Sequence, residues 1–317
     1  MQKHIAFYKF VGINNLLELQ QFLLSASLRL ELKGTMLIAQ EGINGCIVGK
    51  PEDIEKFKSI LCSDARFSDL DFKESPSPET AFKRMLVKIK KEIISFGKPN
   101  IEPAHFTGEY VDAKTLKSWL DAGENVTLVD TRNDYEVKLG TFRGAIDPNI
   151  ETFRQFPEWV DANLNHKKTE RIVTFCTGGI RCEKATAYMR QTGFEQVYQL
   201  KGGILKYFEE NKSEHYDGDC FVFDYRVALQ GDLNTTSHDL CFACRMPLEP
   251  EELKHKLYVH GVQCQYCAQE QQEKQQKQLE KQKLHSALAI ATRKKRSALK
   301  RAEVAKQRNL NHAQQTL

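Results

Sequence analysis

Apolar and polar positions change period several times along the first hundred residues, and these changes predict short strands alternating with helices. Strand patterns cover 4–11, 35–40, 46–49 and 70–72, and helical patterns cover 16–30 and 51–61. The resulting order is strand, helix, strand, strand, helix, strand. This order predicts a ferredoxin-like α+β domain over residues 1–96.

A second alternation of strand and helix patterns follows over residues 109–218. Its short apolar stretches lie at 126–129, 172–175 and 197–200, with helical patterns between them. Such alternation predicts an α/β domain with a mostly parallel sheet and helices on both faces. In sheets of this kind, functional residues gather at the carboxyl ends of the strands. Residues 97–108, which contain two prolines, are the expected linker between the two domains.

The segment after the strand at 172–175 combines a cysteine, two glycines, an arginine and the start of a helix. In chain order it contains Cys176, Thr177, Gly178, Gly179, Ile180 and Arg181. Glycines permit a sharp turn, and a helix N-terminus stabilises an anion or a thiolate. Because the thiolate is the reactive form of cysteine, Cys176 is the candidate nucleophile and Arg181 its cationic partner. A buried structural cysteine at a strand end is the alternative.

Four of the nine cysteines lie in two Cys-x-x-Cys pairs within a Cys-rich extension assigned to 219–268. The pairs are Cys241 with Cys244 and Cys264 with Cys267, separated by 19 residues. This spacing favours a structural tetrahedral zinc site, with redox-active thiols or an iron–sulfur cluster as alternatives. Elsewhere, Cys182 could trap an oxidised Cys176, but we expect its side chain to face another side of the helix.

Composition predicts the cellular compartment and shows that charge is distributed unevenly along the chain. The 317 residues contain no apolar run near the roughly 20 residues that span a bilayer, and the start shows no secretory signal. We therefore expect a cytoplasmic protein without a membrane partner. The net charge is +4, yet residues 268–317 hold 12 Lys and Arg against 4 Asp and Glu. The basic character is thus a property of the tail.

Two basic segments are candidate RNA-binding sites. In a strand pattern over 83–91, the cations Arg84, Lys88 and Lys90 alternate with apolar residues. In the tail over 269–317, expected to be helical or disordered, a cluster contains Arg293, Lys294, Lys295 and Arg296. Rows of Lys and Arg contact phosphates without reading sequence. The alternatives are a solvated strand face and a solvated helix or ribosome-surface tether.

The loop and two further segments carry a resemblance to a known family. The spacing from Cys176 to Arg181 resembles the sulfur-handling loop of rhodaneses. The longer phrase Cys-Thr-Gly-Gly-Ile-Arg-Cys-Glu-Lys-Ala is similar to that of the bacterial rhodanese-type tRNA uridine hydroxylases. The turn Glu-Gly-Ile-Asn-Gly at 41–45 and the segment Asp-Thr-Arg-Asn-Asp-Tyr-Glu at 130–136 agree with that family. The resemblance covers about residues 1–228.

The resemblance implies an acylphosphatase-like first domain, a rhodanese second domain and an oxidoreductase activity. The family's reaction uses molecular oxygen to convert the wobble uridine, position 34 of tRNA, to 5-hydroxyuridine, so the expected partner is a tRNA anticodon loop. In rhodaneses the turn with Asp130 and Arg132 lies near the active loop. We expect these two residues, with Glu136, to form an ion-pair set that holds the turn, or to support substrate positioning. The family's Gly-Ala at 144–145 leads into a further strand.

Three functional hypotheses remain open at this level. Cys176 as the nucleophile of a hydroxylase either adds to C6 of uracil or carries an oxidised sulfur species. The same loop suits a sulfurtransferase with a Cys176 persulfide, and a non-catalytic RNA-binding module is the third hypothesis. No GxGxxG fingerprint or 2-His-1-carboxylate pattern indicates a flavin or non-haem iron. The sequence sets neither the electron donor, nor the tRNAs chosen, nor the oligomeric state.

Overall fold

The computed structural model describes residues 2–77 and 82–282, and its chain separates into two compact units. The first unit holds Met1–Leu240 and Arg245–Pro250, and the second holds Cys241–Cys244 and the chain from Glu251 onward. The first unit contains both of the domains expected from the sequence pattern. Each unit is described by itself.

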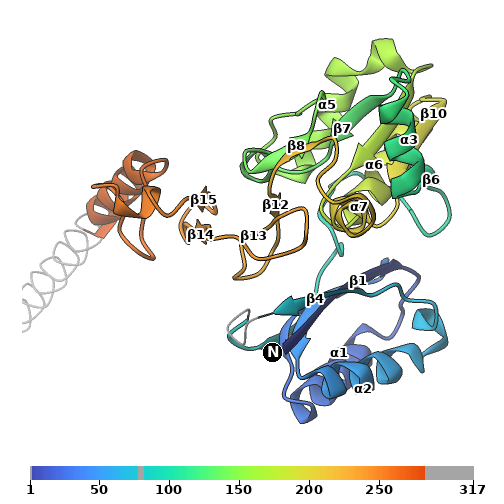
Figure 1. Cartoon of the computed structure of the whole chain (residues 1–317). Coiled ribbons are helices and arrows are strands. Elements are labelled where there is room, and N and C mark those ends of the chain that lie inside the picture. The colour runs from blue at the N-terminus through green and yellow to red at the C-terminus, as the bar shows by residue number, and fades with distance from the viewer. Residues whose placement is uncertain (1, 78–81, 283–317) are drawn as a thin grey trace, which may run out of the picture. The chain divides into compact units, whose positions relative to one another are not determined.

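The N-terminal domain has the predicted ferredoxin-like order of elements (Figure 1). Its elements are β1 (Gln2–Phe10), α1 (Leu16–Arg29), β2 (Lys33–Ala39), β3 (Gly42–Gly49), α2 (Pro51–Cys62), β4 (Lys73–Ser77) and β5 (Met85–Ile89). The sheet order is β4-β1-β3-β2-β5, and β2–β5 is its parallel pair. The strand predicted at 70–72 is wrong, because β4 begins at Lys73. Leu70 and Phe72 instead pack their side chains against the core from a loop, which explains their apolar character.

The alternation of side chains along β1 gives the N-terminal sheet two different faces. Ile5 and Phe7 lie in the core with the residues of α1 and α2, which cover this face (Figure 1). Gly45 lies opposite Phe7, and a Cβ at Gly45 would come within 2.4 Å of the Phe7 ring. The neighbours His4, Ala6 and Tyr8 therefore project from the opposite face.

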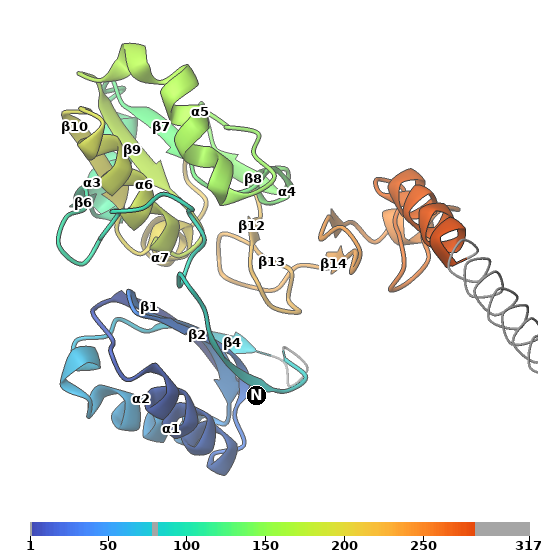
Figure 2. The ribbon, with the colours of Figure 1, turned by 180° about the vertical axis from the view of Figure 1, so that it is seen from behind.

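The second domain is an α/β domain with a fully parallel sheet, as predicted. Its principal elements are β6 (Glu109–Val111), α3 (Ala113–Asp121), β7 (Thr127–Asp130), α4 (Asp134–Val137), β8 (Gly140–Phe142), α5 (Phe156–Asn163), β9 (Arg171–Phe175), α6 (Ile180–Gln191), β10 (Gln196–Leu200) and α7 (Gly203–Asn211). The sheet order is β6-β10-β9-β7. In β9, Ile172 packs in the core with α5 and α6, whereas Val173 packs with α3 and α7. Helices therefore cover both faces (Figure 2).

Short strand pairs follow the parallel sheet. They are β11 (Tyr216–Gly218) with β8, β12 (Cys220–Phe221) with β13 (Ala228–Leu229), and β14 (Asp239–Leu240) with β15 (Pro247–Leu248). Residues 222–227 form the turn between β12 and β13. The strand expected after Gly144 is reduced to an isolated bridge between Ile146 and Val129.

The second unit contains the four cysteines of the two Cys-x-x-Cys pairs and a helix over 268–282. The helix agrees with the prediction for the start of the tail. The basic cluster at 293–296 lies outside the described residues. Across the described parts of the chain, no helix is both long enough and apolar enough to cross a membrane.

Candidate active site

The Cys176 loop lies at the carboxyl end of β9, where the parallel sheet predicts a site. Gly179 has a φ of +98° and caps α6, so the chain turns from strand to helix within a few residues. The start of α7 contacts the backbone of the loop. The N–H of Ile204 donates to the Cys176 carbonyl at 2.9 Å. A Cβ at Gly203 would lie 2.5 Å from the same oxygen, so glycine is required there.

The sulfur of Cys176 is buried and surrounded by donors. The side chain is 1% exposed, and the N–H of Gly179 donates to Sγ at 3.1 Å. Burial alone would raise the pKa of this thiol. A hydrogen bond from Cys182, the charge of Arg181 and the N–H groups of Arg181 and Gly179 outweigh burial and lower the pKa to about 5. Cys176 is therefore a thiolate at neutral pH.

Cys182 faces Cys176, so the expectation that it points elsewhere on the helix is wrong. The helix α6 begins at Ile180, which places Cys182 in its first turn. The Cys182 thiol hydrogen-bonds to Cys176, and the Thr131 hydroxyl lies 3.7 Å from Cys182 Sγ. Burial, together with the neighbouring Cys176, raises the pKa of Cys182 well above its usual value. Cys176, as a thiolate, and Cys182, as a thiol, therefore lie next to each other.

Arg181 pairs with Glu136 rather than with the sulfur itself. Its Nη1 and Nη2 atoms donate to the two carboxylate oxygens at 2.6 and 2.7 Å. The two side chains are 5% and 0% exposed. The sequence suggested that Glu136 forms an ion-pair set with Asp130 and Arg132. Its ion-pair partner is Arg181 instead. This bidentate pair fixes the orientation of α6 relative to α4 and compensates most of the arginine charge.

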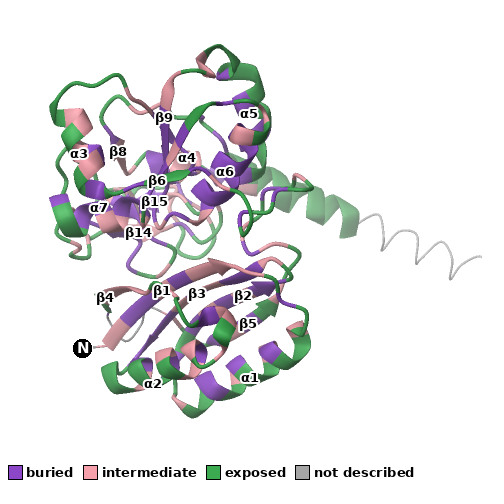
Figure 3. Ribbon diagram, turned by 90° about the vertical axis from the view of Figure 1, so that its right-hand side faces the viewer, coloured by how far each residue is buried: buried purple, intermediate pink, exposed green. Residues whose placement is uncertain are grey.

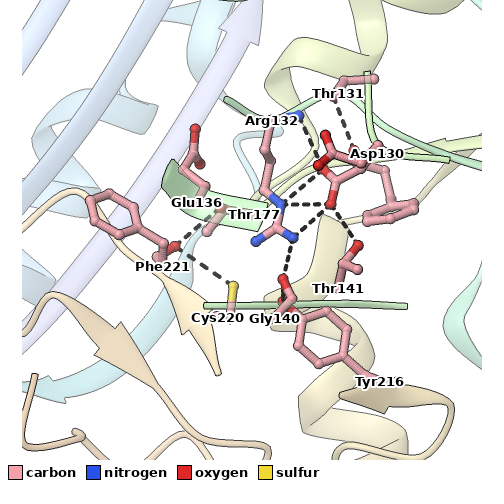
Figure 4. Close-up of polar contacts among 12 residues, drawn as sticks. Asp130, Thr131, Arg132, Glu136, Gly140, Thr141, Thr177, Tyr216, Cys220 and Phe221 are labelled. Carbon is pink, nitrogen blue, oxygen red and sulfur yellow. Dashed lines mark hydrogen bonds and ion pairs between the residues drawn. The ribbon is translucent and has the colours of Figure 1, made fainter. Parts of the chain in front are cut away.

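Asp130 and Arg132 form a separate, fully buried pair under the loop (Figure 4). Arg132 Nε donates to Asp130 Oδ1 at 2.9 Å, and Arg132 Nη2 donates to the Gly140 carbonyl at 2.6 Å. Thr141 adds a hydrogen bond to Asp130 at 2.8 Å. These contacts hold the turn after β7 against β8. Their geometry is that of a structural support, since neither side chain reaches the sulfur of Cys176 through a hydrogen bond in the described residues.

Two charged residues after the loop connect the second domain to the N-terminal sheet, and sequence reasoning missed both. The Tyr8 hydroxyl donates to Glu183 at 3.0 Å, and Tyr110 donates to the same carboxylate oxygen at 2.8 Å. Lys184 pairs with Glu41 at 2.8 Å and with Glu92 at 2.9 Å. The sequence contains no local signal for these partners. The structure supplies the reason for them, because α6 is buried from Arg181 to Met189 (Figure 3) and buried charges require partners.

Residues of β12 and of the turn after it also contact the Cys176 loop and the start of α6. The Thr177 hydroxyl donates to the Phe221 carbonyl at 3.2 Å, as Figure 4 shows. The Arg181 guanidinium lies 5.6 Å from the centre of the Phe223 ring. Arg226 pairs with Asp224 at 2.7 Å and donates to Ser75 of β4. The start of the Cys-rich extension therefore packs on both domains of the first unit.

The described RNA candidates lie on the outer edge of the N-terminal sheet. Met85 and Val87 of β5 are buried, and the side chains of Arg84, Lys88 and Lys90 are exposed. The sheet order makes β5 an edge strand. This arrangement suits phosphate contacts as well as a solvated face, so RNA binding there stays a prediction. The candidates at 293–296 are outside the described residues.

The four sulfurs of the Cys-rich region come together in a geometry that suits a metal. All four Sγ atoms lie within 4.8 Å of one another. Three separations are 3.8, 3.7 and 3.8 Å, for Cys241–Cys267, Cys244–Cys264 and Cys264–Cys267. Tetrahedral zinc with bonds of about 2.3 Å requires sulfur–sulfur distances of about 3.8 Å. We call this set the four-cysteine cluster.

Comparison with known proteins agrees with the two domains of the first unit. A family model described as the UPF0176 acylphosphatase-like domain matches residues 2–93, and the rhodanese-like domain model matches residues 112–210. Among solved structures, the rhodanese-like domain of an Anabaena protein is 28% identical, covering 34% of this chain and 78% of that one, with a TM-score of 0.30. A rhodanese-like domain protein from Staphylococcus aureus is 25% identical, covering 32% and 94%, with a TM-score of 0.27. Such low TM-scores add nothing to the family match. The chain therefore joins a UPF0176 acylphosphatase-like domain to a rhodanese-like domain, which is the architecture of the rhodanese-type tRNA uridine hydroxylases.

Proposed function

We propose that this protein hydroxylates C5 of the wobble uridine of tRNA with molecular oxygen, giving 5-hydroxyuridine. The observation that carries the proposal is the low-pKa Cys176 thiolate, held in a rhodanese loop that contacts a UPF0176 domain. A rhodanese-like domain with an intact loop cysteine supports a cysteine enzyme. The substrate and the reaction come from the resemblance to the tRNA hydroxylases.

The chemistry requires a nucleophile because C5 of uracil does not react readily with oxygen. Addition of the Cys176 thiolate to C6 makes C5 electron-rich, and an anticodon loop already presents its bases unstacked. The overall change consumes uridine, one O2, two electrons and two protons and gives 5-hydroxyuridine and water. The two electrons come from an external two-electron donor such as a dithiol. The N–H groups of the loop stabilise the negative charge of the Cys176 thiolate before addition and again after the sulfur is released from C6.

We also propose that the four-cysteine cluster binds a structural zinc ion. Four thiolate ligands leave no open coordination position, so the ion would cross-link the second unit rather than take part in the reaction. The sulfur separations near 3.8 Å support this assignment.

The direct test uses purified protein, tRNA from cells that lack it, a dithiol and 18O2. We expect 5-hydroxyuridine that carries one 18O atom, as measured by mass spectrometry of nucleosides. The Cys176→Ala variant is expected to form none. An oxygen atom derived from water, equal product from the variant, or no product from the wild type contradicts the proposal.

The second candidate is a sulfurtransferase that carries a persulfide on Cys176. The hydrogen bond from the Gly179 N–H to Sγ favours it, because the same donors stabilise a persulfide anion. A thiosulfate:cyanide assay with a Cys176→Ser control separates the two candidates. Strong turnover in this assay, without any change in tRNA, favours the sulfurtransferase.

A further inference from the structure

The face of the N-terminal sheet opposite α1 and α2 lies beside the Cys176 loop. Ala6 of β1 lies between Lys73 of β4 and Cys46 of β3, and directly opposite residues of a sheet share one face. Tyr8, two positions along β1, projects from the same face. Its hydroxyl would lie 3.0 Å from a Cβ added at Gly179, the glycine that turns the loop. The sheet face opposite α1 and α2 is thus turned toward the loop.

Lys73 is the cation that this face brings to Cys176. Its side chain is only 11% exposed, and its Nζ lies 5.2 Å from the centre of the Tyr8 ring. Burial lowers the pKa of Lys73, and the negative charges of Asp71 and Cys176 only partly oppose this. A desolvated ammonium group therefore lies in the electrostatic range of the thiolate.

The pairing of charges around the loop singles out Lys73. Arg181 is compensated by two hydrogen bonds to Glu136, and Lys184 by Glu41 and Glu92. In contrast, the Asp71 oxygen beside Lys73 is 3.9 Å from Nζ, beyond hydrogen-bonding distance, and the Asp71 side chain is 83% exposed. Of these three cations, Lys73 has the weakest carboxylate pairing. It is the cation most available to a substrate.

We propose that Lys73 binds the C4 carbonyl oxygen of the pyrimidine that Cys176 attacks. This inference rests on the proposed function. When sulfur bonds to C6, the C5–C6 π bond breaks and its electron pair moves onto C5 and the C4 oxygen. The Lys73 ammonium donates a hydrogen bond to that developing enolate. The step is redox-neutral, and reversal returns the electron pair to the ring and releases the thiolate.

The first test measures the thiolate itself and needs no substrate. Absorbance at 240 nm is titrated in the wild type and in Lys73→Met, each with its matching Cys176→Ser protein as the blank. Burial lowers the pKa of Lys73, and the negative charges of Asp71 and Cys176 oppose this shift. We expect Lys73→Met to raise the pKa of Cys176 by about one pH unit. The groups that interact with Lys73 and shape this titration are Tyr8, Cys46, Asp71, Cys176 and Glu209.

Two control variants isolate the charge of Lys73. Lys73→Arg keeps a cation at the same place and is expected to leave the Cys176 titration within a few tenths of a pH unit. Lys56→Met removes an equal charge from the exposed surface of α2 and is expected to change nothing. Equal shifts from Lys73→Met and Lys56→Met overturn the proposal. A thermal melt of each variant confirms that the fold is retained.

The second test follows addition to C6 without oxygen or an electron donor. A base that adds and releases sulfur exchanges its C5 hydrogen, so anaerobic incubation of tRNA in D2O places deuterium at C5 of the wobble uridine. We expect at least a tenfold slower exchange with Lys73→Met than with the wild type, and partial recovery with Lys73→Arg. Unchanged exchange with Lys73→Met overturns the proposal, and so does a lack of exchange by the wild type. Failure of 18O incorporation with normal Lys73-dependent exchange would instead refute only the oxygen chemistry.

Discussion

The buried pair of Arg181 and Glu136 makes a quantitative prediction about how the loop is held. Glu136→Gln keeps the shape of the side chain but removes its charge and sets an amide N–H₂ against the guanidinium. Removing one partner of a buried ion pair leaves an uncompensated charge, which costs about 3–5 kcal/mol. The two hydrogen bonds of 2.6 and 2.7 Å and the near-complete burial of both side chains put this pair in that range.

Urea denaturation followed by tryptophan fluorescence measures this cost directly. Both tryptophans of the chain, Trp119 and Trp159, lie in the second domain, so the signal reports the domain that contains the pair. With an m-value of about 3 kcal/mol/M, the midpoint for Glu136→Gln should fall by about 1–1.7 M. The double variant Glu136→Gln/Arg181→Met removes the stranded charge and should recover part of the loss.

The same substitution has a chemical readout at the sulfur. Without Glu136, the positive charge of Arg181 is no longer compensated, and a positive charge favours the thiolate. The pKa of Cys176, about 5 in the wild type, should therefore be lower in Glu136→Gln. A loss of less than 1 kcal/mol in the single variant, or strictly additive losses in the double variant, would refute the reasoning about this pair.

Three further predictions follow from the site and the second unit. Cys182→Ala removes a hydrogen-bond donor to the thiolate, so the pKa of Cys176 should rise, and an unchanged titration at 240 nm would contradict the role of Cys182. Elemental analysis should find one zinc ion per chain in the four-cysteine cluster. A chelator should unfold the second unit, as measured by faster amide hydrogen exchange there. A metal-free protein whose second unit stays fully protected from exchange would exclude the zinc. Reversing the charges of Arg84, Lys88 and Lys90 to Glu should weaken tRNA binding and reduce its salt dependence, whereas unchanged affinity would identify a solvated face.

The local features of the site could be predicted from the sequence because they depend on neighbouring residues. An apolar strand, a pair of glycines and a helix start within ten positions define the Cys176 loop, and the structure has this loop at the end of β9. The position of Cys182 was missed for a local reason as well. Cys182 lies in the first turn of α6, and the exact residue at which the helix begins decides which way its side chain faces.

The long-range partners could not be predicted, because the sequence contains no local signal for them. Glu136 is 45 positions from Arg181, and Tyr8 is 175 positions from Glu183. Pairing at such separations depends on how α4 and β1 pack against α6. Likewise, the apolar residues at 70–72 satisfied a strand pattern, although their side chains cover a core edge from a loop. Burial of α6 from Arg181 to Met189 is the feature that requires these partners.

The measurement that tests the central claim most directly is mass spectrometry of tRNA nucleosides from cells that lack this protein. The cells are complemented with the wild type or with Cys176→Ala, and any redundant hydroxylation route is removed. We expect 5-hydroxyuridine and its derivatives to vanish and only the wild type to restore them. Unchanged 5-hydroxyuridine together with reduced wobble thiolation would contradict the account and identify a sulfur carrier instead.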